Sequence, residues 1–324
     1  MLDQLGAIGN VAILAVSLVV LIKASSLAIN NSVKLASVTG LGKTKIGFML
    51  VAFSTSLPEL FVVIFSIIDP KAIGISIGNV LGSNIVNICL ILGAGFLLMA
   101  LKYPKSAGFF TQMARDEVGN LNFGIFIASI VPLSLLYIGY TSQIVGFLLI
   151  FLFIFNMYGL AKKRETVQEI SDEAEKRGLV KYFGESLLGI IGIVVTAYFI
   201  VESGSFLASA AGVPPVIIGA TVIAFGTSVP ELATSLESVG NGFLDLAVGN
   251  IIGSCFLNIT LILGLTFLLA PFNVDLSAFS DLIIFSLIAN IMLWYMLQNT
   301  KVSKREGLIL LAVYSVFLAI SFVP

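Results

Sequence analysis

The sequence predicts an all-α membrane protein with ten transmembrane helices, arranged as two inverted five-helix repeats. Three observations lead to this fold class: the composition, the spacing of the apolar segments and an internal repeat. Of the 324 residues, 58% are hydrophobic and only 11% are charged, whereas an ordinary soluble domain has about 25% charged residues. A soluble core of this length cannot hide so many apolar side chains, but a bilayer can. The composition therefore excludes a soluble enzyme, a nucleic-acid-binding protein and a disulfide-built secreted domain.

Ten apolar segments separated by polar breaks are long enough to cross a bilayer, at about 20 residues per helix. They lie at 5–29, 44–68, 72–100, 121–138, 142–161, 184–207, 214–238, 243–270, 277–297 and 306–323. Asp3 and the absence of a basic run before the first segment indicate a membrane span and not a cleaved signal peptide. A hydrophilic linker at 162–183 is too short to be a domain. It divides the chain into five-helix repeats at 1–161 and 184–324.

The basic residues predict the orientation of the chain. When the loops are numbered alternately from an N-terminus outside, 15 of the 17 Lys and Arg residues fall on the inside. Lys71 falls outside, and Lys23 lies within the first span. The positive-inside rule predicts this asymmetry. We therefore expect an integral protein of the cell membrane with both termini outside and the central linker in the cytoplasm.

Two sequence blocks occur twice in the chain. AFSTSLPEL at 52–60 returns as AFGTSVPEL at 224–232, with seven of nine positions identical. GNVLGSNIVNICLILG at 78–93 returns as GNIIGSCFLNITLILG at 249–264, with ten of 16 positions identical. Because each half has an odd number of spans, the second copy enters the membrane from the opposite side. Inverted repeats of this kind are typical of secondary transporters, which bind their substrate near the midplane where the repeats meet.

The first block places a glutamate in the middle of a span in each repeat. A charge at that depth costs at least ~2.5–3.5 kcal/mol, so Glu59 and Glu231 require a cation or protons to neutralise them. Pro58 and Pro230 precede them and are predicted to kink or break each helix, which frees backbone carbonyls. Four hydroxyl side chains lie beside these carbonyls: Thr55, Ser56, Thr227 and Ser228. Such hard oxygen ligands suit Ca²⁺ or Na⁺.

The second block adds amide and hydroxyl oxygens. Ser83 and Asn87 are four residues apart, as are Ser254 and Asn258, so each pair shares one helical face and can complete a coordination shell. The block also contains Asn79, Asn84 and Asn250. Asn79 and Asn250 have a second interpretation as interhelical hydrogen-bonding groups. The Gly78-x-x-x-Gly82 and Gly249-x-x-x-Gly253 spacings are typical of close helix packing.

Other features constrain the chemistry. Cys89 and Cys255 both lie in apolar runs, so we expect small apolar fillers and not a structural disulfide. The chain has no histidine, which removes imidazole ligands and every Ser-His-Asp or Cys-His arrangement. We therefore do not expect an enzyme. Lys23 and Glu202 are further intramembrane charges, and we do not assign them to the site.

At these two blocks the chain resembles the cation/calcium exchanger superfamily, and in particular its prokaryotic, archaeal-like sodium/calcium exchangers. The G-T-S-x-P-E and G-N-x-x-G-S-x-x-x-N segments look like the α-repeats of that family, and the resemblance covers all ten spans. It implies a midplane cluster of ion sites, with spans one and six as a sliding gate. The implied ligands are the carbonyls of Ala52 and Ala224 and the side chains of Thr55, Ser56, Glu59, Ser83, Asn87, Thr227, Ser228, Glu231, Ser254 and Asn258.

Two residues depart from the family pattern. Ser54 stands where the motif usually has glycine, and Asn258 stands where some members have aspartate. Glu59 and Glu231 are therefore the only carboxylates expected in the site. The resemblance implies an antiporter that exchanges Na⁺ for Ca²⁺ by alternating access, electrogenically, in the lipid bilayer. It implies no cofactor, no nucleic acid and no obligatory protein partner.

Two other kinds of transport use similar chemistry. A proton-coupled antiporter for Ca²⁺ or another divalent cation would use the same two carboxylates. The Gly-Asn-x-x-Glu signature typical of that branch is absent from the sequence, which favours coupling to sodium. An ion channel is disfavoured by the inverted repeat and by the lack of a selectivity-filter loop.

Overall fold

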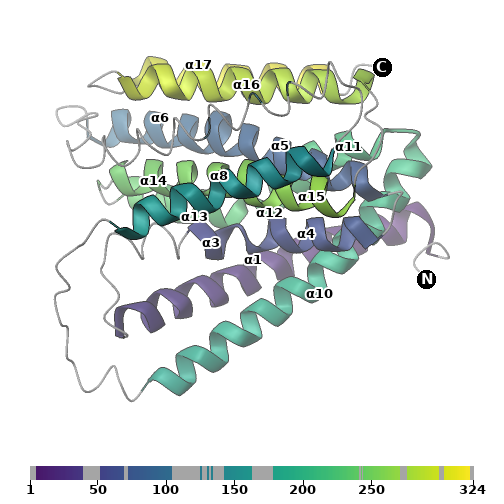
Figure 1. Ribbon diagram of the computed structural model, residues 1–324, viewed down its shortest axis with the longest axis horizontal. Helices are drawn as coiled ribbons and strands as arrows, with labels where there is room; N and C mark the ends of the chain where they lie inside the picture. The colour runs from purple at the N-terminus through teal and green to yellow at the C-terminus, as the bar shows by residue number, and fades with distance from the viewer. Residues whose placement is uncertain are drawn as a thin grey trace.

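The computed structural model describes residues 5–38, 52–68, 72–103, 125, 130, 133, 142–162, 178–240, 242, 244–270, 276–298 and 303–321. These residues form helices and contain no β-strand (Figure 1). Nine of the ten predicted spans correspond to a helix or to a series of helices. The span predicted at 121–138 lies outside the described residues except for three helical positions, 125, 130 and 133.

The first repeat contains α1 (Gly6–Val38), α3 (Ala52–Thr55), α4 (Leu57–Ile68), α5 (Ile73–Ile85), the π-helical segment η4 (Val86–Leu92), α6 (Gly93–Lys102) and α8 (Gln143–Lys162). The second contains α10 (Leu179–Ala211), α11 (Pro215–Ile218), the π-helical η5 (Gly219–Ile223), α12 (Ala224–Thr227), α13 (Val229–Gly240), α14 (Leu244–Leu257), the π-helical η6 (Asn258–Ile262), α15 (Leu263–Leu269), α16 (Leu276–Gln298) and α17 (Lys304–Ser321). Within the described chain, five helices are long and apolar enough to cross a membrane, or six if the bent pair α11–α13 counts as one.

Two helices, α1 and α10, extend furthest beyond the predicted spans. α1 continues to Val38, and α10 begins at Leu179, within the segment expected to be linker. A helix satisfies its own backbone hydrogen bonds, so it can continue past the apolar stretch into the polar flank. α10 ends at Ala211, and the next residue, Gly212, has a φ of 65°, a left-handed conformation that glycine adopts without steric cost.

The predicted breaks before the glutamates are present in both repeats. α3 ends at Thr55 and α4 begins at Leu57; α12 ends at Thr227 and α13 begins at Val229. The axis bends by 45° between the helices of the second repeat. Proline has no N–H to donate to the carbonyl four residues earlier, so Pro58 and Pro230 explain why each helix is interrupted at this point.

The two repeats pack against each other through small residues. A Cβ atom added to Gly78 would lie 2.1 Å from the carbonyl oxygen of Val216, and one added to Gly82 would lie 2.3 Å from that of Ala220. The contacts of α5 with α11 and η5 therefore require glycine at both positions, as the spacing predicted. α1 lies alongside α10 on one side of the molecule (Figure 1), where Gly189 approaches the backbone of Ala28.

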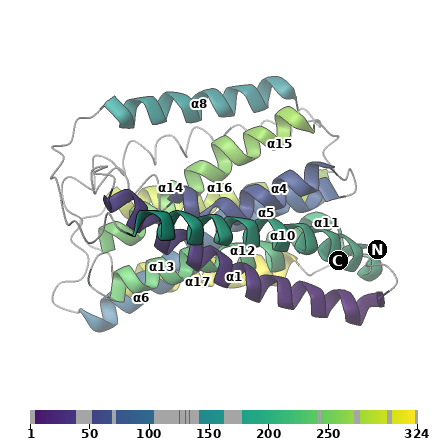
Figure 2. The same ribbon diagram turned by 90° about the horizontal axis from the view of Figure 1, so that it is seen from below.

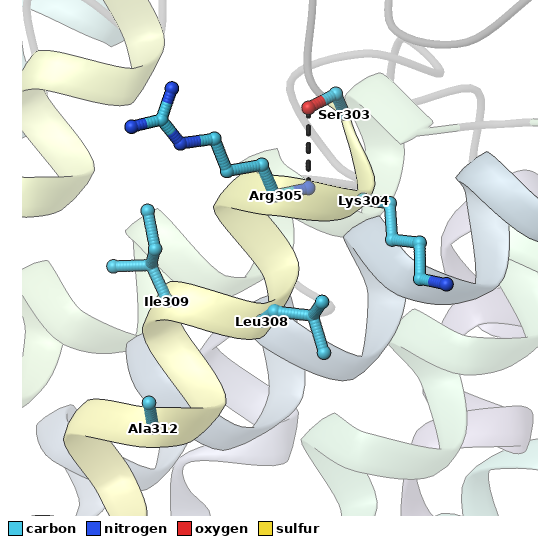
Figure 3. Close-up of a pocket in the computed structure, with 6 residues that line it drawn as sticks. All are labelled: Ser303, Lys304, Arg305, Leu308, Ile309 and Ala312. Atoms are coloured by element: carbon cyan, nitrogen blue, oxygen red, sulfur yellow. Dashed lines mark hydrogen bonds between the residues drawn. The ribbon is translucent and has the colours of Figure 1, made fainter.

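The remaining helices pack around the helices that carry the two repeated blocks. α8 lies at one edge and packs on α15 (Figure 2), with Gly146 against the backbone of Leu268. α17 packs on α6, and its first turn is fixed by a capping box. The backbone N–H of Arg305 donates to Ser303 Oγ over 3.2 Å (Figure 3), while the Ser303 N–H donates to Glu306 Oε2 over 2.8 Å. Many large apolar side chains on α1, α8 and α10 are exposed, as expected of surfaces that face lipid.

The two cysteines are free thiols and are buried. This agrees with the expectation of no disulfide between Cys89 and Cys255. At the C-terminal end of α6, the side chains of Lys102 and Tyr103 both donate to the backbone carbonyl of Gly240, the last residue of α13. The distance from Tyr103 Oη to this oxygen is 3.0 Å. These bonds join the two repeats at that end of the motif helices.

Candidate functional site

The helices that carry the two repeated blocks meet at the centre of the molecule. α4 contacts α5 and α13 contacts α14 within each repeat, while α12 contacts α5 and α14 contacts α3 across the repeats. All ten predicted site side chains that bear a hydroxyl, carboxylate or amide group are buried, with at most 3% of their surface exposed. The structure therefore brings both copies of the motif into one enclosed, polar centre.

Each glutamate is linked to the opposite repeat through a serine of its own repeat. Ser83 donates to Glu59 Oε1 over 3.5 Å, and its hydroxyl lies 3.4 Å from that of Thr227. The second repeat has the matching arrangement. Ser254 donates to Glu231 Oε1 over 3.3 Å, and its hydroxyl lies 3.2 Å from that of Thr55.

Three pairs of symmetry-related oxygen atoms remain without a hydrogen-bond partner among the residues that the structure describes. They are Oγ of Ser56 and Ser228, Oε2 of Glu59 and Glu231, and Oδ1 of Asn87 and Asn258. A buried polar group left without a partner costs about 1–3 kcal/mol, and native proteins contain only a few of them. Six in one place, all of them possible acceptors or cation ligands, are what an oxygen-coordinated cation site requires.

The two buried negative charges of the centre also favour a bound cation. Both carboxylates are fully buried, and within the described part of the chain neither forms an ion pair with Lys or Arg. Two buried negative charges without a basic partner are strongly unfavourable unless a cation or protons neutralise them. The described residues contain no group of three His, Cys, Asp or Glu side chains that could hold a metal ion. Hydroxyl and amide oxygens would therefore supply most of any coordination shell here.

One of the two backbone carbonyls expected in the site, that of Ala224, already accepts a hydrogen bond within its own helical segment. The Ala224 carbonyl accepts from the Ser228 N–H over 3.0 Å and from Thr227 Oγ1 over 3.3 Å. A carbonyl oxygen has two lone pairs, whereas the Thr227 hydroxyl has a single proton. That hydroxyl lies closer to Asn79 Oδ1, at 3.0 Å, so one lone pair of the Ala224 carbonyl is available to an ion. Ala52 is the first residue of α3, and its side chain lies outside the described part of the structure.

The other asparagines of the second block differ between the repeats. Asn79 Oδ1 accepts from Thr227 Oγ1 over 3.0 Å, whereas Asn250 Nδ2 donates to Thr234 Oγ1 over 3.2 Å. Both therefore form hydrogen bonds between helices, as the second interpretation expected. Asn84 has a partner that the sequence does not reveal: its Oδ1 accepts from Asn258 Nδ2 over 3.3 Å, across the two repeats.

Three π-helical segments border the centre, and the sequence did not predict them. η4 includes Asn87, η6 begins at Asn258, and η5 ends directly before Ala224. π-helical turns often occur at functional sites because they shift side chains relative to a regular helix. The equivalence of η4 and η6 shows that this feature is part of the internal repeat.

Comparison with known proteins gives one consistent result. A sequence family described as "Sodium/calcium exchanger protein" matches residues 9–162 and 181–323. The chain is 31% identical to the sodium/calcium exchanger MaX1 of Methanosarcina acetivorans, over 97% of this chain and 98% of that protein. These similar proteins are exchangers and not enzymes.

Solved structures share the fold. The sodium-calcium exchanger NCX_Mj, soaked with 10 mM Na⁺ and zero Ca²⁺, matches with a TM-score of 0.69 and 25% identity over 97% of this chain and 99% of that one. The H⁺/Ca²⁺ exchanger CAX matches with a TM-score of 0.76 and 15% identity over 96% of this chain and 85% of that one. The second match shows a common fold alone.

Proposed function

The chain belongs to the sodium/calcium exchanger family, and on that premise we propose that it is a secondary active antiporter that exchanges Na⁺ for Ca²⁺ by alternating access. The observation that carries the proposal is the set of six symmetry-related oxygen atoms around Glu59 and Glu231 that have no hydrogen-bond partner among the described residues. Ca²⁺ takes six to eight oxygen ligands in flexible geometry. Carboxylate, hydroxyl and amide oxygens from both repeats supply that number without any soft ligand.

The proposed ligands are the twelve groups that the family resemblance implies. Glu59 and Glu231 bind Ca²⁺ directly and balance its charge. The hydroxyl and amide groups complete its shell or hold Na⁺ in the return step. The carbonyls of Ala52 and Ala224 complete the proposed set, and the Ala224 carbonyl would offer an ion the lone pair that the Ser228 N–H does not use.

The charges of the site make the exchange electrogenic. With both glutamates ionised the empty site carries two negative charges, which one Ca²⁺ neutralises. Three Na⁺ ions in the return step would leave one net positive charge, so each cycle moves one charge across the membrane. That movement is worth about 2.3 kcal/mol per 100 mV, and an inside-negative potential would assist Ca²⁺ extrusion. Two protons in place of three Na⁺ would give an electroneutral cycle.

The proposed setting is the cell membrane, with both termini outside and the central linker in the cytoplasm. The excess of Lys and Arg in the loops assigned to the inside supports this orientation. Extrusion of Ca²⁺ and entry of Na⁺ are the directions that a normal sodium gradient and membrane potential would drive.

A tracer experiment in proteoliposomes tests the coupling ion. Vesicles loaded with Na⁺ are diluted into Na⁺-free medium containing labelled Ca²⁺, and a parallel set carries an outward H⁺ gradient without Na⁺. We expect Ca²⁺ uptake in the first set and only background uptake in the second. Uptake driven by the pH gradient alone would identify the proton-coupled antiporter. Currents through single open channels, with no dependence on a countertransported ion, would indicate a channel.

A further inference from the structure

We propose that Asn84 is a positioning residue, which holds the amide of Asn258 so that its oxygen faces the transported ion. The inference rests on the proposed function, because it concerns the orientation of one ligand in that ion site. Asn258 Nδ2 donates to Asn84 Oδ1 over 3.3 Å. Both side chains are fully buried, so no water from the bulk competes for this hydrogen bond.

The orientation of an amide decides whether it can bind a cation. Its oxygen is a ligand, whereas its NH₂ group is a donor and repels positive charge. The two groups point in different directions from Cγ. A partner that binds the nitrogen of Asn258 therefore turns its oxygen away from that partner. Asn258 Oδ1 has no hydrogen-bond partner among the described residues, and it is thus available to an ion.

The repeat itself shows that this contact is a special feature of one half. The position equivalent to Asn84 in the second block is Cys255, whose thiol is only a weak hydrogen-bonding group. Asn87, the counterpart of Asn258, faces the weakly bonding Cys255 thiol and forms no hydrogen bond with another amide among the described residues. The two amide ligands therefore differ: Asn258 is held in one orientation, and Asn87 is not held by an equivalent amide.

A merely structural role for Asn84 makes a different prediction. An interhelical hydrogen bond would stabilise the fold whatever side chain lies at position 258. A positioning role exists only while that side chain has one oxygen and one nitrogen. A carboxylate presents oxygen from both ends and needs no orienting partner. Asn258→Asp should therefore make Ca²⁺ affinity insensitive to the residue at position 84.

A double-mutant cycle in proteoliposomes tests this directly. The apparent KM for Ca²⁺ and the maximal rate are measured for the unmodified protein, Asn84→Leu, Asn258→Asp and the double variant. Removing a group that orients a metal ligand typically weakens affinity by about 10- to 100-fold. We expect Asn84→Leu to raise KM about tenfold with little change in the maximal rate, and to raise it less than about threefold in the Asn258→Asp background. Ser76→Ala is the matched control: it removes another buried hydrogen bond between the repeats, to Thr266 over 3.1 Å and outside the proposed site, and should leave KM unchanged.

Three outcomes separate the possible failures. An unchanged KM in Asn84→Leu, or the same increase in both backgrounds, overturns the positioning role while leaving the antiporter intact. Absence of Ca²⁺ flux in the unmodified protein overturns the proposed function itself. If Asn84→Leu does not yield folded protein, Asn84→Ala removes the amide without adding apolar bulk. The increase in KM that it causes is then compared between the unmodified and the Asn258→Asp protein, with the same two outcomes.

Discussion

Gly82→Ala tests how the contact between the repeats supports the ion site. The added Cβ would lie 2.3 Å from the carbonyl oxygen of Ala220 and 2.5 Å from its Cα. Both are backbone atoms of η5, so they cannot rotate away. Relief to the 3.0 Å that real Cβ contacts respect requires α5 and η5 to separate by roughly 0.7 Å, a strain typical of overpacked cores.

This separation acts directly on the site. Ser83 follows Gly82 in α5, and its hydroxyl lies 3.4 Å from that of Thr227, already close to the limit of a hydrogen bond. Overpacking typically costs about 1–3 kcal/mol, whereas helix propensity alone favours alanine over glycine by about 1 kcal/mol. We therefore expect Gly82→Ala to lower the melting temperature in detergent and to reduce Ca²⁺ flux strongly.

Gly184→Ala is the matched control. Gly184 lies inside α10, and a Cβ at that position would have no atom of the described residues within 4 Å. Propensity then acts alone, so the melting temperature should stay the same or rise, and Ca²⁺ flux should be unchanged. If Gly82→Ala behaved like Gly184→Ala in both assays, the argument from close packing at η5 would be refuted.

Three further predictions concern charge and orientation. Glu59→Gln and Glu231→Gln should each abolish or severely reduce Ca²⁺ flux in proteoliposomes, because one carboxylate alone cannot balance a partly dehydrated divalent ion; near-normal flux in either variant would contradict this. In a background without Cys89 and Cys255, a cysteine at position 172 should react with membrane-impermeant reagent only from the cytoplasmic side; labelling from outside intact cells would overturn the orientation. Na⁺-driven Ca²⁺ flux should change when K⁺ and valinomycin clamp the vesicle potential, and indifference to potential would rule out three-to-one exchange.

The sequence predicted the centre of the fold better than its edges. The helix breaks at Ser56 and Ser228 follow from proline chemistry, which is local and strict. The close contact at Gly78 and Gly82 follows from a short spacing of small residues. The end of α1 and the start of α10 lie outside the predicted spans, because hydropathy marks where lipid surrounds a helix and not where the helix itself stops.

Two features of the site had no usable signal in the sequence. The π-helical segments η4, η5 and η6 lie in mostly apolar stretches, where the choice between i→i+4 and i→i+5 hydrogen bonds is decided by packing. The pairing of Asn84 with Asn258 joins residues 174 positions apart. The spacing of each block places its own residues on one helical face, but it does not specify which amide of the other repeat that face meets.

Equilibrium binding of Ca²⁺ to the purified protein tests the central claim most directly. Labelled Ca²⁺ is titrated into the detergent-solubilised protein with and without Na⁺, for the unmodified chain and for the Glu59→Gln and Glu231→Gln variants, with Gly184→Ala as a control for folding. The account predicts one saturable Ca²⁺ site per chain that Na⁺ displaces and that either glutamine substitution removes. Ca²⁺ binding that persists undiminished in both glutamine variants would contradict the assignment of these two carboxylates to the ion site.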